Sequence, residues 1–145
     1  MPATDLHHTA TTRLRKLGQR YTANRRALVG VLDGAEGPLT IPQILDRDPD
    51  LAQSSAYRNL AVLEQAVVVH RIVTNDDHAR YELTEDLTEH HHHLICSSCG
   101  EVADFTLDAK VEGDIDRVLS RIAAKTGFSV DHHRLDLIGS CSTCD

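Results

Sequence analysis

All four cysteines of this chain lie in two Cys-x-x-Cys pairs that are separated by 41 residues. A turn of this kind places two thiolates side by side, and two such turns brought together complete a tetrahedral four-sulfur cage that suits Zn²⁺. Gly100 directly after the first pair is typical of such a knuckle, since glycine tolerates a positive φ. The pattern predicts a structural zinc site with the ligands Cys96, Cys99, Cys141 and Cys144.

Paired cysteines have two other uses. Two redox disulfides, as in a zinc-releasing switch, would employ the same pairs. A secreted disulfide scaffold is disfavoured, because Met1–Thr12 lacks the apolar segment of a signal peptide. The chain also lacks a run of about 18 apolar residues, so no membrane helix is expected, and the expected location is the cytoplasm.

The N-terminal half begins with a helical pattern. Residues 1–12 are polar and are expected to form a frayed arm. From Arg13 to Leu32 the apolar residues recur at helical spacing, which predicts two helical pieces separated by Gly18. Thr22 has the side chain of a good N-cap for the second piece.

Two further helices and a hairpin are expected after it. Thr40 should cap a short helix, and Ser54 or Ser55 should cap a third one. The expected strand, turn and strand of the hairpin are residues 67–69, 75–77 and 79–83. An order of helix, helix, helix, hairpin is that of a winged helix-turn-helix, whose third helix enters the major groove of DNA.

The remaining residues predict a linker and a smaller α/β domain, so that the whole chain is of the α+β class. The expected boundaries are a winged-helix DNA-binding domain at 1–83, a hinge linker at 84–89, and a dimerisation and metal-binding domain at 90–145. The expected elements of the last domain are strands at His93–Cys96 and Glu101–Phe105, a helix from about Ala109 to Thr126 closed by Gly127, and a strand near Arg134–Ile138.

This second domain has little material for a core. The helix should turn its apolar residues inward: Val111, Ile115, Val118, Leu119 and Ile122. A few strands and one helix bury little surface, so the domain is expected to need a metal and a partner chain, most simply a second copy in a homodimer.

The net charge of −7 is unevenly distributed. Residues 1–83 hold ten basic and ten acidic side chains, whereas residues 84–145 hold five and twelve. Six basic residues and no acidic residue lie between Arg13 and Arg26. Such a cluster can neutralise DNA phosphates, and a solvated helix face is an equally good interpretation on charge alone.

Four consecutive histidines, His90–His93, come shortly before the first cysteine pair. In an extended chain His91 and His93 would face one side and His90 and His92 the other, which could supply two metal sites. The carboxylates and histidines within reach in sequence are Glu82, Asp104, Glu112, Asp116, His70, His132 and His133. Nitrogen and oxygen donors suit Fe²⁺, Mn²⁺, Zn²⁺ or Ni²⁺. A solvated polar run is the alternative; a purification tag is disfavoured by the position inside the chain.

An enzyme would need more than these donors. A zinc ion held by histidines with an open coordination position could hydrolyse a substrate. The sequence contains no His-Glu-x-x-His helix, no nucleophile elbow and no phosphate loop. Catalysis is therefore not expected.

Several of these segments match one family. The segments 18–25, 54–60, 90–100 and 139–144, which are GQRYTANR, SSAYRNL, HHHHLICSSCG and GSCSTC, resemble successive motifs of the ferric uptake regulator superfamily. The resemblance covers nearly the whole chain from Leu14. It implies a homodimeric transcriptional repressor that binds palindromic operators in double-stranded DNA when it is loaded with a regulatory metal.

The resemblance also implies roles for residues by position. The regulatory metal ligands would be Glu82, His91, His93 and Asp104, with His70 as a further candidate. The second metal site would be His90, His92, Asp116 and His133. The DNA contacts would be Tyr57, Arg58, Ser54, Ser55, Asn59 and Arg20.

The chain departs from the family at four places. Residues 36–39 lack the histidine that many members carry there, which is why His70 is a candidate. No cysteine is left for the regulatory site, and this favours iron over zinc. Val67 stands where a glycine is usual, and Glu112 competes with Asp116 because of extra residues near it. An iron-dependent peroxide-sensing repressor, or a metal-binding or redox protein that does not bind DNA, are the alternatives.

Overall fold

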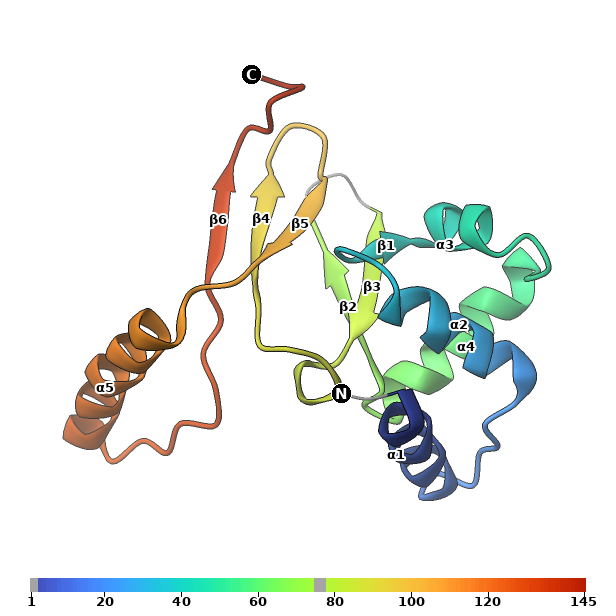
Figure 1. Ribbon diagram of the computed structural model, residues 1–145, viewed down its shortest axis with the longest axis horizontal. Helices are drawn as coiled ribbons and strands as arrows, with labels where there is room; N and C mark the ends of the chain where they lie inside the picture. Colours follow the sequence, from blue (N-terminus) through green and yellow to red (C-terminus); the bar gives the residue numbers. More distant parts are fainter. Residues whose placement is uncertain (1–2, 75–77) are drawn as a thin grey trace.

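The computed structural model describes residues 3–74 and 78–145, so the turn expected at 75–77 lies outside the described residues. In chain order the elements in Figure 1 are α1 (Ala3–Arg15), α2 (Ala23–Asp33), β1 (Leu39–Thr40), α3 (Ile41–Arg47), α4 (Gln53–Gln65), β2 (Val69–Val73), β3 (Ala79–Leu83), the 3₁₀ helix η1 (Glu85–Leu87), β4 (His92–Cys96), β5 (Val102–Phe105), α5 (Ala109–Thr126) and β6 (Asp136–Gly139). We refer to residues 3–83 as the head and to residues 90–145 as the body.

The head has the expected order of helices followed by a hairpin. Its sheet has the order β1-β3-β2 with antiparallel pairing, and the short strand β1, which the sequence analysis did not anticipate, pairs Leu39 with Tyr81. Fully buried leucines and isoleucine from α2, α3 and α4 meet under the sheet: Leu28, Ile44, Leu60 and Leu63. The packing leaves one face of α4 exposed.

The expectation of a frayed N-terminal arm is wrong. Helix α1 begins at Ala3, and Leu6, Ala10 and Leu14 are completely buried in the core of the head. Their spacing of four residues places them on one face of a helix. Gly18 ends the segment with a φ of +70°, where Gln19 N–H donates to Leu14 O at 2.9 Å.

Two of the three expected N-caps are present. The side chain of Thr22 accepts from Arg25 N–H, and Thr40 forms a capping box with Gln43. The third is wrong, because α4 begins at Gln53, so Ser54 lies inside its first turn and the N-cap residue makes no side-chain cap bond.

The backbone conformation at the end of α4 shows why a glycine is usual at the position of Val67. Val67 has a φ of +61°, the left-handed conformation that glycine adopts without strain, and Val68 N–H donates to Leu63 O at 3.0 Å to close the helix. Strand β2 therefore begins at Val69 rather than at Val67.

The body is a three-stranded sheet of order β5-β4-β6 with α5 between β5 and β6 in the chain. Strand β4 runs antiparallel to β5 and parallel to β6, and this register places Cys96 beside Gly139. Gly127 has a φ of +69° and caps α5 as expected.

The expectation that α5 turns its apolar side inward is wrong for the single chain. Val111, Val118 and Ile122 are 39%, 51% and 56% exposed, and Ala123 is the one buried residue of the helix. Figure 1 shows α5 at the edge of the molecule that lies away from the head. No helix of the described ranges is long and apolar enough to cross a membrane.

Candidate metal centres

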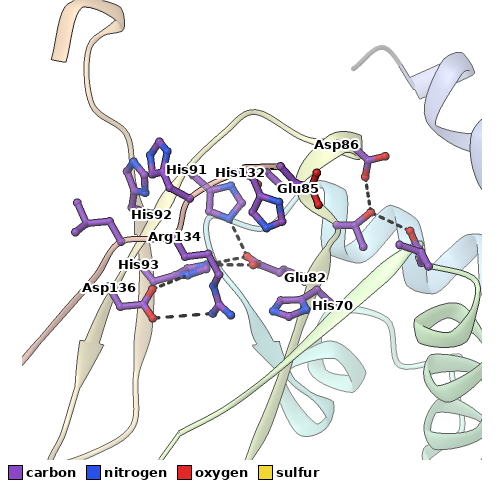
Figure 2. A pocket seen from close by; sticks show the side chains of 15 residues that line it. His70, Glu82, Glu85, Asp86, His91, His92, His93, His132, Arg134 and Asp136 are labelled. Atoms are coloured by element: carbon purple, nitrogen blue, oxygen red, sulfur yellow. Dashed lines mark hydrogen bonds and ion pairs between the residues drawn. The ribbon is translucent and has the colours of Figure 1, made fainter. Parts of the chain in front are cut away.

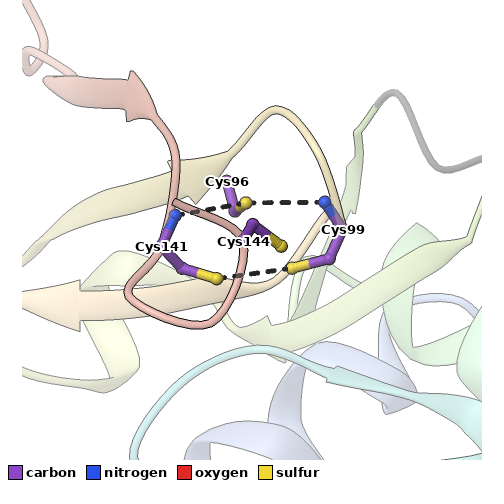
Figure 3. A group of neighbouring side chains, drawn as sticks. All are labelled: Cys96, Cys99, Cys141 and Cys144. Carbon is purple, nitrogen blue, oxygen red and sulfur yellow. Dashed lines mark hydrogen bonds between the residues drawn. The ribbon is translucent and has the colours of Figure 1, made fainter.

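The parallel pairing of β4 and β6 brings the two cysteine pairs together (Figure 3). The four Sγ atoms lie within 4.8 Å of one another, and those of Cys99 and Cys141 are 3.8 Å apart. The backbone N–H groups of Cys99 and Cys141 both donate to Cys96 Sγ at 3.4 Å, and they lower the pKa of that thiol to about 6. A stabilised thiolate among four convergent sulfurs fits Zn²⁺, as the sequence predicted.

A second cluster joins the head to the body, and we call it the hinge site: Glu82, His91, His93 and Asp104. Glu82 lies on β3 of the head, whereas the other three lie in the body. Figure 2 shows Glu82 with His91 and His93. The Glu82 carboxylate is 2.9 Å from His91 Nε2 and 3.1 Å from His93 Nε2. Asp104 comes from β5, directly opposite His93 in the sheet, and its oxygens lie 3.6 and 3.8 Å from the same two imidazoles.

The charges of the hinge site are strongly coupled. Burial would raise the pKa of Glu82, but hydrogen bonds from His91 and His93 outweigh it and lower the pKa to about 2. The bond to Glu82 raises the pKa of His91 to about 9. Burial raises the pKa of Asp104, whose Oδ1 is buried and has no hydrogen-bond partner among the described residues. Two carboxylates and two imidazoles that converge in this way fit a divalent cation.

A third cluster lies wholly in the body, and we call it the body site: His90, His92, Glu112 and His133. Glu112 Oε2 lies 3.1 Å from His133 Nε2 and 3.4 Å from His90 Nε2, and its other oxygen contacts His92. Oε2 of Glu112 and the Nε2 atoms of His90 and His133 are buried, and they have no hydrogen-bond partner of good geometry among the described residues. Buried oxygen and nitrogen atoms that converge on one point without hydrogen bonds are suited to bind a metal ion.

Asp116, the alternative to Glu112, lies behind this cluster. Its carboxylate is 3.1 Å from Nδ1 of His133, the nitrogen that faces away from Glu112. Glu85 contacts Nδ1 of His90 in the same manner. Carboxylates in these places orient imidazoles whose other nitrogen holds a metal.

His70 lies beside the hinge site but outside the cluster of four. It pairs with Glu82 across β2 and β3, and both line a cavity of about 660 Å³ between the head and the body (Figure 2). His132 and Arg134 line the same cavity. The structure thus brings His70 near the hinge site, but His70 is not one of the four clustered residues.

The residues predicted to contact DNA differ in their exposure and in their hydrogen bonds. Ser54, Tyr57 and Arg58 are exposed on α4, Ser55 is partly buried, and Arg20 is exposed before α2. Asn59 instead accepts a hydrogen bond from Arg25 Nε at 3.0 Å, and Arg25 also donates to Gln19 and to the Arg20 carbonyl. Arg25 thereby fixes α4 against the segment before α2, a role that no local pattern in the sequence indicates.

Arg13 also has a structural role that its place in the basic cluster did not indicate. Its guanidinium donates to Val67 O at 2.7 Å and pairs with Asp86, so that α1 is tied to the end of α4 and to η1. The hydrogen bond from Arg13 lowers the pKa of Asp86.

Three convergent donor sets, one of them shared between a helical head and a β-rich body, define a metal-binding protein of mixed helix and sheet. The family model described as the ferric uptake regulator family matches residues 16–138, and the chain belongs to that family of metal-responsive regulators. This confirms the resemblance found in the sequence.

Individual relatives agree with this assignment. The peroxide operon regulator of Bacillus subtilis is 30% identical over 135 residues, which cover 90% of this chain and 88% of that protein. The ferric uptake regulator of Helicobacter pylori, described as having three functional metal-binding sites, has a similar fold with a TM-score of 0.73 at 24% identity, covering 99% of this chain and 94% of the other. The manganese-bound ferric uptake regulator of Pseudomonas aeruginosa has a TM-score of 0.67 at 26% identity, covering 90% and 96%.

Proposed function

We propose that the chain is a homodimeric repressor that binds palindromic double-stranded DNA when the hinge site holds a divalent metal ion. The observation that carries the proposal is the origin of the ligands: Glu82 belongs to the head, and His91, His93 and Asp104 belong to the body. A site of this kind can only be complete when the head and the body are held in one arrangement.

The mechanism follows from the residues around the linker. Without an ion, Glu82 is joined to the body by two hydrogen bonds to imidazoles, and these compete with water at a partly exposed site. A bound cation would supply the positive charge that draws the carboxylates of Glu82 and Asp104 to one point. With Glu82 held in this way, the linker of residues 84–89 would no longer let the head move. The two heads of a dimer would then keep a fixed spacing. The ion acts by binding the closed arrangement more tightly than the open one.

The exposed face of α4 is the part of the head that would meet the DNA. Tyr57 and Arg58 project from it, and Tyr57 is 55% exposed. The basic residues around Arg20 would contact phosphates, so DNA binding should weaken steeply with salt. These contacts account for recognition by a head whose net charge is zero.

The dimer would form through the body. Several of its exposed apolar residues lie on α5 and β6, and Ile138 is 71% exposed. Exposed apolar surface on this scale is uncommon on a monomer and is typical of a protein interface. A second copy would bury it and would present two heads to the two halves of a palindrome.

Iron is the favoured regulatory metal. The hinge site offers two nitrogen and two oxygen ligands and no sulfur, a set that also accepts Mn²⁺, Zn²⁺ or Ni²⁺. The four cysteines form a separate cage for structural zinc. Metal analysis of the purified protein, followed by DNA binding titrated with each ion, decides among these metals.

Peroxide sensing is the second candidate, and the relation to the Bacillus subtilis peroxide operon regulator favours it. In that case the iron-loaded protein treated with H₂O₂ should gain one oxygen atom on His91 or His93, while the peroxide is reduced to water. Mass spectrometry of the tryptic peptides measures this gain. An unmodified peptide after loss of DNA binding would contradict peroxide sensing.

The proposed function is tested by the double variant His91→Ala/His93→Ala. DNA is first selected from a random pool with the wild-type protein and Mn²⁺, and binding is then measured by gel shift with and without metal. The double variant should retain zinc and lose the metal-dependent part of DNA binding. His132→Ala, in the same cavity but outside the clusters, is the matched control and should respond normally. A full metal response by the double variant would overturn the assignment of the hinge site.

A further inference from the structure

The head touches the body at a second place, where the loop between α2 and β1 meets strand β5. A Cβ atom added to Gly37 of this loop would lie 3.1 Å from the carbonyl oxygen of Val102, 3.6 Å from Ala103 Cα and 3.7 Å from Asp104 N. All three neighbours are backbone atoms of the body. The two parts of the chain therefore pack backbone against backbone, and a side chain at residue 37 would occupy the contact.

This contact is connected to the hinge site by short and rigid paths on both sides. On the body side, Asp104 is itself a hinge-site residue and pairs with His93 across β5 and β4. On the head side, the loop leads directly into β1, where Leu39 pairs with Tyr81 of β3, the residue before Glu82. The depth at which the loop rests on β5 thus sets the distance from Glu82 to the imidazoles.

We propose that Gly37 is a positioning residue for the hinge site: its lack of a side chain lets the head rest on β5 closely enough for Glu82 to complete the set of ligands. The loop itself supplies none of the four residues of the cluster. The proposal deepens the proposed function, because it explains how the head is placed before the ion binds.

The physical argument is one of space and not of backbone strain. Gly37 is not among the glycines with positive φ, so alanine fits its backbone conformation. A Cβ at 3.1 Å from a carbonyl oxygen is too close, so the loop and the strand must separate by a few tenths of an ångström. Metal–ligand distances tolerate about 0.2 Å, so even this small separation disturbs a shared site. Valine, with two further methyl groups, should separate them more.

The test compares metal affinities of Gly37→Ala, Gly37→Val and Gly30→Ala on the zinc-loaded full chain. Gly30 lies in α2 of the same half, and a Cβ there meets nothing within 4 Å, which makes its variant the matched control. Binding of Mn²⁺ is measured by calorimetry, and the variant His91→Ala/His93→Ala identifies which binding phase belongs to the hinge site. Thermal unfolding reports whether each head still folds.

We expect Gly37→Val to lower the Mn²⁺ affinity of the hinge site by tenfold or more, and Gly37→Ala to lower it by a smaller factor. The body site and the zinc content should stay at their wild-type values, as should both sites in Gly30→Ala. Wild-type affinity at the hinge site in Gly37→Val would overturn the proposal, and so would an equal loss at the hinge and body sites. If the affinity falls in Gly37→Val but DNA binding by the wild-type protein proves independent of metal, Gly37 keeps this role and the proposed function fails.

Discussion

The head and the body are folded by different means. Every member of the apolar core cluster lies in the head except Leu87 of η1, so the described head has a core that is complete within one chain. The buried residues of the body include Cys96 and the histidines His92 and His93, which are donors to the three clusters. In the head, burial of apolar surface supplies the stability, whereas the body places ligands where a core would be. We therefore expect the stability of the body, unlike that of the head, to depend on bound ions and on a partner chain.

This difference also separates two kinds of site. The zinc cage and the body site draw all their ligands from the body, and they can be complete whether or not the head moves. The hinge site alone takes a ligand from each part. Of the three clusters found among the described residues, the hinge site is the one in which a bound ion would join the head to the body directly.

Loss of the zinc cage should have the largest effect and should be confined to the body. Cys96→Ser removes the one buried thiol of the four, and structural zinc contributes on the order of 10 kcal/mol to small domains of this kind. We expect loss of zinc, dissociation of the dimer and proteolysis after residue 90, with the head intact. Metal analysis, sedimentation and limited digestion measure these, and the exposed Ser142→Ala serves as control. A variant that keeps its dimer without zinc would refute the contrast between the two halves.

The reverse change should affect the head alone. Leu14→Ala removes a completely buried side chain of α1 and should lower the free energy of unfolding of the head by roughly 2–5 kcal/mol. Leu17→Ala, three residues later and 47% exposed, should lower it by much less. Denaturant unfolding followed by circular dichroism gives both values. Equal effects of the two substitutions would mean that α1 does not pack as described.

Within the body, Glu112 and Asp116 should differ in their effect on metal binding. Glu112→Gln removes the carboxylate that faces three imidazoles and should abolish tight binding at the body site. Asp116→Asn changes only the partner of His133 Nδ1 and should weaken binding roughly 10- to 100-fold. Titration with Mn²⁺ ranks the two variants. A larger loss in Asp116→Asn would reverse their assignment.

The smallest expected effect is a gain of stability in the head. A β-branched residue in the left-handed conformation is strained, so Val67→Gly should raise the free energy of unfolding by about 1 kcal/mol. Val73→Gly changes an equally exposed valine of β2 with ordinary strand geometry and should lower it. If thermal unfolding shows that both variants are destabilised, then backbone strain at Val67 does not lower the stability of the head.

The sequence was sufficient to predict elements with strong local signals. Thr22, Thr40 and Gly127 mark helix ends by side-chain or backbone chemistry that acts within a few residues, and all three are confirmed. The alternation of His90–His93 correctly separated His90 and His92 from His91 and His93, which belong to two different clusters. These features depend on periodicity and on caps, which the order of residues contains.

The errors arose where contacts far apart in the chain decide. Leu6 and Ala10 looked like parts of a polar arm, because only the core formed by later helices gives them a place to be buried. The choice between Glu112 and Asp116 depends on which turn of α5 faces the loop before β6. The structural contacts of Arg13 and Asn59 likewise depend on residues far along the chain, Asp86 and Arg25.

The most direct test of the account is the metal response of Glu82→Ala, which deletes the one hinge-site ligand of the head and leaves the three of the body in place. DNA selected with the wild-type protein is titrated with this variant over increasing Fe²⁺ or Mn²⁺ under anaerobic conditions, and bound ion is measured in parallel. We expect zinc and body-site ions to remain while DNA binding stays at its metal-free level throughout. A wild-type increase in DNA binding would contradict the claim that an ion shared between the head and the body controls the protein.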